Sequence, residues 1–333
     1  MRIAAAAIGC MILLLTLVQT NSGMTNYLTF LKQTKTAGIT DQVQSANAER
    51  WDEAKLREHL TAVANERNIP PVDARVDRVW KAIPGYNGLE LDMEKTVQQA
   101  AESPSSEPLI YYYKQIPPKI GLDQLGPQPI YRGNENKPMV AIMINVAWGN
   151  EYLEAILETL DREKVKSTFF LDGTWLKNNV ELAKKIKAQG HELSNHAYSH
   201  PNMSQLGRQA AYAQIAKTEN LLKEKLEVNN KWFAPPSGDY NLMTVQVASQ
   251  LGLKTVLWTI DTVDWMKPTP SSIVSKIKAK LEPGALILMH PTASSRDALP
   301  GMIAAARSRG YAIDTVTSTL SSDRVTPSVE GRP

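Results

Sequence analysis

Residues 139 to 310 alternate short apolar runs with longer helical stretches, and this alternation limits the possible folds more than any other feature of the chain. The short runs are rich in β-branched and aromatic residues, and glycines such as Gly190 and Gly252 end the helical stretches. The pattern is typical of parallel βα units and predicts an α/β fold, a distorted (β/α) barrel over residues 138–320. The predicted strands are 139–146, 166–171, 192–194, 232–235, 254–260 and 285–290, and the predicted helices are 150–163, 174–189, 205–227, 241–251, 271–281 and 296–309.

The flanking sequence predicts a smaller domain, a linker and a tail. Residues 24–117 combine a polar helical segment with a small α+β module, in which residues 109–113 form a predicted strand. Residues 118–137 are rich in Pro, Gly, Gln and Asn, which predicts a linker. Residues 321–333 are polar and predict a disordered tail.

The first residues predict export of the chain. Met1-Arg2 precedes an apolar run over residues 3–18, and a polar stretch follows. Residues 1–23 predict either a cleaved signal peptide or an uncleaved membrane anchor, because the run is slightly shorter than the roughly 20 residues that span a bilayer. We expect the protein at the extracellular face of the cell envelope, secreted or anchored by residues 3–18. Cys10, the only cysteine, lies in this run, so the exported part can form no internal disulfide.

The charge balance argues against nucleic acid as a partner. The chain has 37 basic and 34 acidic residues, which give a formal net charge of +3, and it contains no basic run. We expect contact with the membrane only through the N-terminal segment. An anionic polymer such as a cell wall would attract this chain only weakly.

Polar and unusual side chains follow the predicted strands at the points where the strands end. In βα barrels the functional site forms at the carboxyl ends of the strands, so we expect these residues to share one cleft. They are Ala147 and Trp148 after the first strand, Asp172 after the second, His196 and His200 after the third, Ser237 after the fourth, Asp261 and Asp264 after the fifth, and His290 at the end of the sixth.

His196 and His200 have a spacing that suits a metal ion. Two neutral imidazoles four residues apart in a tight loop can share one divalent ion. The same histidines can also stabilise the loop without any ligand, and the residues alone leave both interpretations open.

Five segments carry a resemblance to a known family: Asn145-Val-Ala-Trp-Gly149, His196-Ala-Tyr-Ser-His200, Ala234-Pro-Pro-Ser-Gly238, Asp261-Thr-Val-Asp-Trp265 and Leu286-Ile-Leu-Met-His290. Residues 138–320 resemble the polysaccharide deacetylase (NodB-homology) domain of carbohydrate esterase family 4. The whole chain is similar to sporulation-associated deacetylase-like proteins of spore-forming Gram-positive bacteria. Its N-terminal module resembles peptidoglycan-binding domains, with a structural spacer as the alternative.

The resemblance implies a NodB-type barrel and a metal-dependent N-deacetylase with a divalent metal, often zinc. It implies that His196 and His200 are metal ligands. It also implies roles for His290 as general acid, Asp264 as the partner of that histidine, Ser237 as a backbone donor to the oxyanion, and Trp265 and Leu288 as walls of the substrate pocket.

Two positions of the family pattern have lost their acids. Ala147 stands at the general base, and Trp148 stands at the third metal ligand. Losing a general base costs about 10²–10⁴ in rate, and two imidazoles leave a zinc shell incomplete. Asp172 is a candidate replacement ligand, but a cap of the following helix is the interpretation we favour.

We therefore expect an exported cell-envelope or sporulation protein with weak or no activity toward N-acetylglucosamine-containing glycan, and with peptidoglycan or a similar cell-wall glycan as its partner. One alternative is an active metal-dependent peptidoglycan or chitooligosaccharide N-deacetylase that uses replacement ligands. Another is a structural or recruiting protein of the spore envelope.

Overall fold

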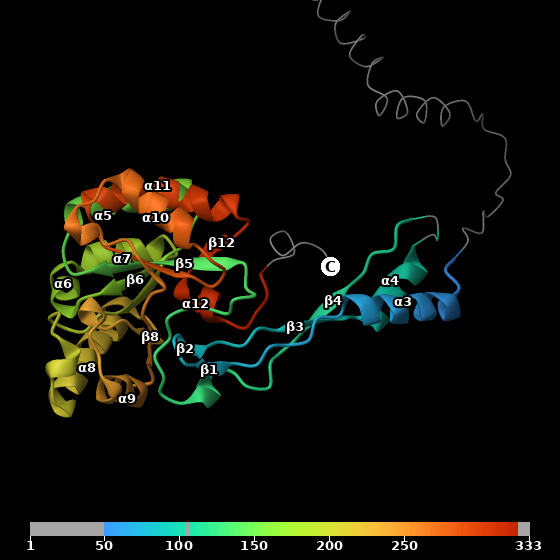
Figure 1. Ribbon diagram of the computed structural model, residues 1–333, viewed down its shortest axis with the longest axis horizontal. Coiled ribbons are helices and arrows are strands. Elements are labelled where there is room, and N and C mark those ends of the chain that lie inside the picture. Colours follow the sequence, from blue (N-terminus) through green and yellow to red (C-terminus); the bar gives the residue numbers. More distant parts are fainter. Residues whose placement is uncertain (1–49, 104, 106, 326–333) are drawn as a thin grey trace, which may run out of the picture. The chain divides into compact units, whose positions relative to one another are not determined.

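The computed structural model describes residues 50–103, 105 and 107–325 (Figure 1). The predicted signal peptide or anchor, the polar residues up to 49 and residues 326–333 of the predicted tail lie outside this part of the chain. Within the described part, no helix combines the length and the apolar character needed to cross a membrane.

The second half of the chain folds around one parallel sheet. The strand order is β10-β11-β5-β6-β7-β8-β9, and β12 (Ala312–Asp314) pairs with the start of β5. Although β9 and β10 lie at opposite ends of this order, only residues 256–259 separate them, so the sheet curls into a half-barrel. This confirms the predicted α/β class. The strands are β5 (Met139–Val146), β6 (Thr168–Leu171), β7 (Glu192–Asn195), β8 (Trp232–Phe233), β9 (Lys254–Thr255), β10 (Ile260–Asp261) and β11 (Leu286–Met289).

Helices follow the strands and cover the outside of the curled sheet (Figure 1). The predicted helix over residues 174–189 is two helices, because Asn179 leaves the helical conformation (φ −131°, ψ 38°) and its side-chain Nδ2 donates to the carbonyl oxygen of Trp175 at 2.8 Å. The helices are α5 (Asn150–Arg162), α6 (Gly173–Asn178), α7 (Val180–Ala188), α8 (Arg208–Leu226), α9 (Leu242–Gln250), α10 (Pro270–Lys280), α11 (Ala293–Ser308) and α12 (Val316–Leu320).

All of β5 is buried, and its two faces belong to different cores. Ile142 and Ile144 pack in the core between the sheet and the helices. Ala141 and Met143 pack in a smaller core with Phe170, inside the curl of the sheet. A parallel strand covered on both faces needs a nearly continuous apolar run, and residues 139–146 provide one that only Asn145 interrupts.

The N-terminal module is a small α+β unit with its own core. Helix α3 (Glu53–Arg67) and helix α4 (Met93–Glu102) pack with the antiparallel pair β3 (Gly88–Leu91) and β4 (Tyr113–Ile116). A second pair, β1 (Arg75–Asp77) and β2 (Lys81–Ile83), follows α3 in the chain. The strand predicted over residues 109–113 is shifted along the chain, because the observed strand β4 begins only at Tyr113. The core side chains are Leu56, Leu60, Val63, Leu91 and Ala100.

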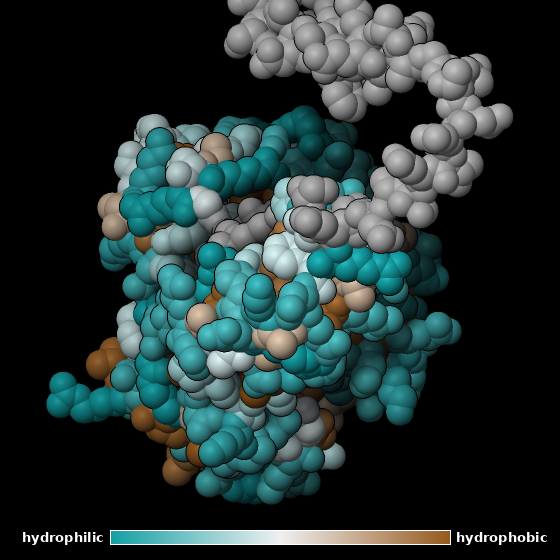
Figure 2. All heavy atoms as spheres, turned by 90° about the vertical axis from the view of Figure 1, so that its right-hand side faces the viewer, coloured by the Kyte–Doolittle hydropathy of each residue, from teal (hydrophilic) through white to brown (hydrophobic). Residues whose placement is uncertain are grey.

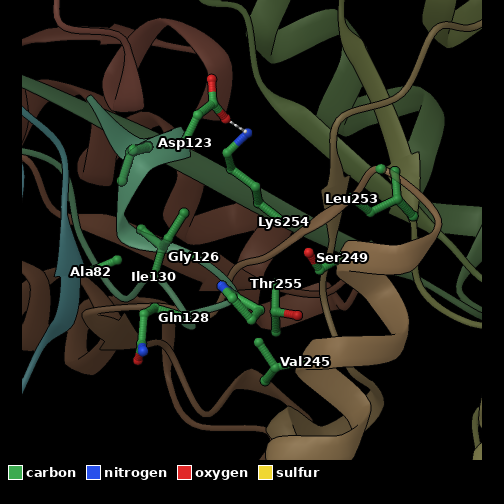
Figure 3. A pocket seen from close by; sticks show the side chains of 13 residues that line it. Ala82, Asp123, Gly126, Gln128, Ile130, Val245, Ser249, Leu253, Lys254 and Thr255 are labelled. Carbon is green, nitrogen blue, oxygen red and sulfur yellow. Dashed lines mark ion pairs between the residues drawn. The ribbon is translucent and has the colours of Figure 1, made fainter. Parts of the chain in front are cut away.

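Residues 118–137 do not form a free linker. They include the short helix η1 (Leu122–Leu125), and Ile130 is 1% exposed in the core inside the curl. The amide of Ile130 donates to the carbonyl oxygen of Thr255 at 3.0 Å. Between this segment and α9 lies a cavity of about 210 Å³, beside which Lys254 pairs with Asp123 at 2.6 Å (Figure 3). The composition predicted a linker, but the buried isoleucine anchors the segment to the sheet.

Residues 321–325 are also packed, in contrast to the predicted disordered tail. The carbonyl oxygen of Ser322 accepts from the amide of Asn87 at 2.8 Å, and Val325 is buried.

Most residues on the face of the molecule shown in Figure 2 are hydrophilic, and its hydrophobic residues form small groups, as expected for a folded surface.

Candidate functional site

A cavity of about 380 Å³ lies at the carboxyl ends of the barrel strands. Eight residues that the sequence placed at strand ends or in the family motifs line it: Ala147, Trp148, His196, His200, Ser237, Trp265, Leu288 and His290. Asp261, also expected at a strand end, and Asn145, the first residue of the first motif segment, line it too, together with Trp258, which sequence reasoning had not selected. The expected shared cleft is therefore present.

The loops around the cavity contain side chains in the left-handed backbone conformation. Ala197 (φ 60°) and His200 (φ 53°) follow β7, Ser237 (φ 57°) follows β8, and Val263 (φ 56°) follows β10. Residues with a Cβ adopt this conformation at a cost, and such costs cluster at functional sites, where surrounding contacts determine the backbone. Four such residues around one cavity mark this rim as a candidate functional site.

His196 is held in the form that can bind a metal ion. Its Nδ1 lies 2.8 Å from the carbonyl oxygen of Ala234, so Nδ1 carries the proton and Nε2 keeps a free lone pair. Nε2 is buried and has no hydrogen-bond partner among the described residues. Burial, with a smaller contribution from the neighbouring His200, lowers the pKa of His196 to about 3. The two rings lie 5.2 Å apart, centroid to centroid.

The residues present do not complete the metal centre that the resemblance implies. Ala147 and Trp148 provide no ligand oxygen, and Asp261 already accepts from the amide of Val263 at 2.7 Å. Across residues 50–103, 105 and 107–325, no three or more His, Cys, Asp or Glu side chains form a group that could hold a metal ion. Structural and catalytic zinc sites normally use at least three protein ligands, so His196 and His200 alone provide only a partial site.

Asp264 and His290 form a buried acid–imidazole pair. Asp264 is fully buried, and its Oδ1 accepts from Nδ1 of His290 at 2.8 Å. Its Oδ2 accepts from the backbone amide of His290 at 2.6 Å and from the hydroxyl of Ser295. These contacts fix the imidazole with Nδ1 on the aspartate and leave Nε2 for a ligand in the cavity. Ser295 was not expected from the sequence, in which it looks like an ordinary residue of a helix start.

Trp148 stacks on His290. The two rings are nearly parallel (6°), with centroids 6.1 Å apart, and Trp148 is 47% exposed. The loops that carry them meet closely, because a Cβ added to Gly149 (φ 84°) would lie 2.1 Å from the carbonyl oxygen of Pro291. Glycine at position 149 thus allows the loop after β5 to approach the loop after β11, so that the indole reaches the imidazole.

Asp172 caps a helix. Its Oδ1 accepts from the amide of Trp175 at 2.9 Å and from the hydroxyl of Thr174, at the start of α6. The side chain is 1% exposed and does not line the cavity. The favoured interpretation of Asp172 as a helix cap is therefore confirmed, and the structure does not place it as a substitute ligand.

Comparisons with known proteins agree with this geometry. The family model of polysaccharide deacetylase matches residues 132–256. The chain is 44% identical over 270 residues to the uncharacterized protein YlxY of Bacillus subtilis, covering 81% of this chain and 85% of that protein. It is 30% identical over 199 residues to a peptidoglycan-N-acetylglucosamine deacetylase of Bacillus cereus, covering 58% of this chain and 72% of that protein.

Solved structures give the same result. The chain is similar to BA3943, a CE4 family pseudoenzyme from Bacillus anthracis, with a TM-score of 0.76 and 40% identity over 81% of this chain and 96% of that chain. A mutant of that pseudoenzyme with restored enzymatic activity matches with a TM-score of 0.76 and 39% identity over 81% of this chain and 99% of that chain. Since the sequence relatives, the fold and the cleft all agree, the chain belongs to the polysaccharide deacetylase family.

Proposed function

We propose that this protein is an exported cell-envelope protein that binds N-acetylglucosamine-containing glycan and hydrolyses it weakly or not at all. The observation that carries the proposal is the composition of the cleft. The pair Asp264 and His290 and the two imidazoles of His196 and His200 are in place, but Ala147 and Trp148 stand where the base and the third ligand are expected.

Amide hydrolysis needs an activated water, a donor to the oxyanion and an acid for the leaving amine. His290 can provide the acid, and the backbone N–H of Ser237 can provide a donor, because that role does not depend on the side chain. Ala147 cannot take a proton from water, and two imidazoles hold a divalent ion weakly. The chain therefore keeps the groups that bind and protonate, and lacks those that generate the nucleophile.

The relatives support a glycan as the partner. Matching proteins include a peptidoglycan-N-acetylglucosamine deacetylase of Listeria monocytogenes and a chitooligosaccharide deacetylase of Sinorhizobium fredii. Export is supported by the apolar run at residues 3–18, and a role in sporulation by the resemblance described above. We propose peptidoglycan as the first ligand to test, since it is the glycan that an exported bacterial protein meets.

One observation favours a second candidate, residual metal-dependent deacetylation. Nε2 of His196 is buried and unpartnered among the described residues, as expected for a nitrogen that meets a ligand. His200 lies beside it in the same cavity. This candidate predicts that the wild-type protein releases acetate from N-acetylglucosamine oligomers and that a chelator abolishes the release.

Restoring the two acids tests the proposal. We expect Ala147→Asp combined with Trp148→Asp to raise zinc affinity and to raise acetate release from N-acetylglucosamine oligomers by at least about 10²-fold, since a base and a ligand return together. The double variant Ala147→Asn with Trp148→Asn is the control, because it has the same shape without the charge. Zinc content and acetate release are measured on all three proteins. Wild-type activity equal to that of the aspartate variant would refute the proposal.

A further inference from the structure

We propose that Trp148 is itself a sugar-binding residue, whose indole face packs against a pyranose ring of an N-acetylhexosamine glycan at the mouth of the cavity. The inference rests on the proposed function and deepens it. It assigns a binding role to the side chain that stands where the family pattern has a metal ligand.

The indole is held in place before any ligand arrives. It stacks on His290, and that imidazole is fixed by the buried Asp264. Its own backbone is fixed by Gly149, which lies against Pro291. A side chain that is already ordered loses little conformational entropy on binding, which is the condition for a useful binding surface.

Topology places a second indole across the cavity. Strands β10 and β5 are the two neighbours of β11 in the sheet. Trp148 follows β5, Trp265 follows β10, and Leu288 and His290 lie between them at the end of β11. The cavity therefore has an exposed tryptophan on each flank, 47% and 57% exposed.

The chemistry of these walls fits a sugar ring. A pyranose has faces of C–H groups and an edge of hydroxyl groups. The C–H groups carry partial positive charge and pack on the negative π-face of an indole, while the hydroxyl groups need hydrogen-bond partners. Asn145, Asp261 and the imidazoles line the same cavity and can provide those partners. A cavity of about 380 Å³ is large enough for one small ligand unit.

The same position cannot serve both purposes. An aspartate at 148 would provide a ligand oxygen for an ion at His196 and His200, whereas the indole has no ligand atom and stacks on His290 instead. A tryptophan in place of an acid at position 148 therefore exchanges a metal ligand for a contact with the glycan. This explains why a protein with an incomplete metal site keeps an open cavity with ordered walls.

Calorimetric titration of the full chain tests the inference, with two probes: the tetramer of N-acetylglucosamine and disaccharide units of peptidoglycan. We expect wild-type protein to bind one or both, and Trp148→Ala to weaken binding about tenfold, in line with the loss of an aromatic contact. Trp148→Phe should keep most of the affinity, and Trp148→Leu, which keeps an apolar side chain but no π-face, should lose as much as the alanine variant. The control is Tyr212→Ala, because Tyr212 is 46% exposed but does not line the cavity.

The outcomes are distinct. If the wild type binds and the alanine and leucine variants bind equally well, the role of Trp148 is refuted and the proposed function stands. If the wild type binds neither probe, the proposed function fails and the inference fails with it. Circular dichroism and thermal melting of each variant separate a lost contact from a lost fold, and the leucine variant, compared with the phenylalanine variant, provides the answer if the alanine variant does not fold.

Discussion

His191 is a buried histidine that lies outside the cleft, at the start of the loop into β7. It is 5% exposed, its ring lies 5.2 Å from that of Phe169, and its Nδ1 accepts from the amide of Ser167 at 3.3 Å. Burial, with a smaller contribution from the charge of Lys166, lowers its pKa to about 4. The folded protein therefore keeps this imidazole neutral at pH values where the unfolded chain takes up a proton.

This difference predicts a loss of stability in acid. The free energy of unfolding should be highest above pH 6.5 and should fall as the pH drops toward 4, by up to roughly 3 kcal/mol from this residue, because the unfolded chain binds the extra proton. His196 contributes in the same direction, so the test is a difference between variants. Urea unfolding at pH 7, 5.5 and 4.5 should show a smaller fall for His191→Gln than for wild type. His59→Gln, on the exposed side of α3, is the control and should keep the wild-type slope; an equal slope in both variants would contradict the assignment.

The sequence could predict those site residues whose type alone indicates a chemical role, such as histidine at the end of a strand. His196, His200 and His290 stand out at strand ends, and the structure brings them to one cavity. Ser295 could not be found in this way, because its contact with Asp264 joins residues 31 positions apart in the chain, and a helix-start serine gives no sign of its partner.

The loop between β5 and α5 depends on one glycine. Gly149→Ala places a Cβ 2.1 Å from the carbonyl oxygen of Pro291 and also forces an alanine to φ 84°. The conformation alone costs about 1–2 kcal/mol, and the clash with backbone adds to it. We expect a destabilisation above 3 kcal/mol and a loss of the stacking of Trp148 on His290.

Gly310 is the matched control for this prediction. It has a similar φ of 75°, but an added Cβ would have nothing within 4 Å. Gly310→Ala should therefore cost only the conformational part, roughly 1–2 kcal/mol, in the same thermal or urea unfolding experiment. Equal costs at both glycines would show that the approach of Pro291 is not what requires glycine at position 149.

At the scale of elements, periodicity located the strands and helices well, but it did not show contacts between distant segments. Most predicted strands and helices after residue 139 lie close to the observed elements. The strand predicted over 254–260 is wrong, because it is two strands, β9 and β10, and between them the amide of Leu257 donates to the carbonyl oxygen of Ile130. The sequence also did not predict β12 and α12. The helix predicted over 174–189 breaks at Asn179, because its side chain bonds to the preceding turn. The segment 118–137 looks polar as a whole, yet Ile130 anchors it in a core shared with the sheet, and Leu122 and Leu125 pack against the same core. An average over the composition of the segment does not show these few apolar residues.

Residues 321–325, which follow α12, contact the N-terminal module. Arg324 donates to the carbonyl oxygen of Asn87 at 2.8 Å, its amide donates to Gln115 at 2.9 Å, and its guanidinium lies 4.7 Å from the ring centroid of Tyr86. These contacts link two parts of the described chain that are more than 200 residues apart.

Arg324→Ala should therefore loosen the N-terminal module more than the barrel. We expect a loss of about 1–2 kcal/mol, from the hydrogen bond and the cation–π contact, and faster amide exchange in β3 and β4 than in β5. Arg296→Ala is the control, since that guanidinium also lies over a tyrosine ring, Tyr152, but within the barrel. Uniform exchange changes over the whole described chain would show that Arg324 does not join the two parts.

For the molecule as a whole, the sequence predicted the fold class and the position of the cleft, because a parallel barrel leaves a strong periodic pattern and its strand ends meet at one rim. It did not predict that residues 118–137 and 321–325 are packed. Ile130 and Arg324 contact parts of the fold that are distant in the chain, and a local sequence pattern does not show which distant residues will lie beside them.

The stacked pair of Trp148 and His290 also gives the protein a built-in optical reporter. Indole emission responds to the polarity and charge of what lies against the ring. Any molecule that enters the cavity, or any ion that settles beside His196 and His200, would change the light emitted by this one tryptophan. Occupancy of the cleft could then be followed without attaching a dye, by subtracting the spectrum of Trp148→Phe from that of the wild type.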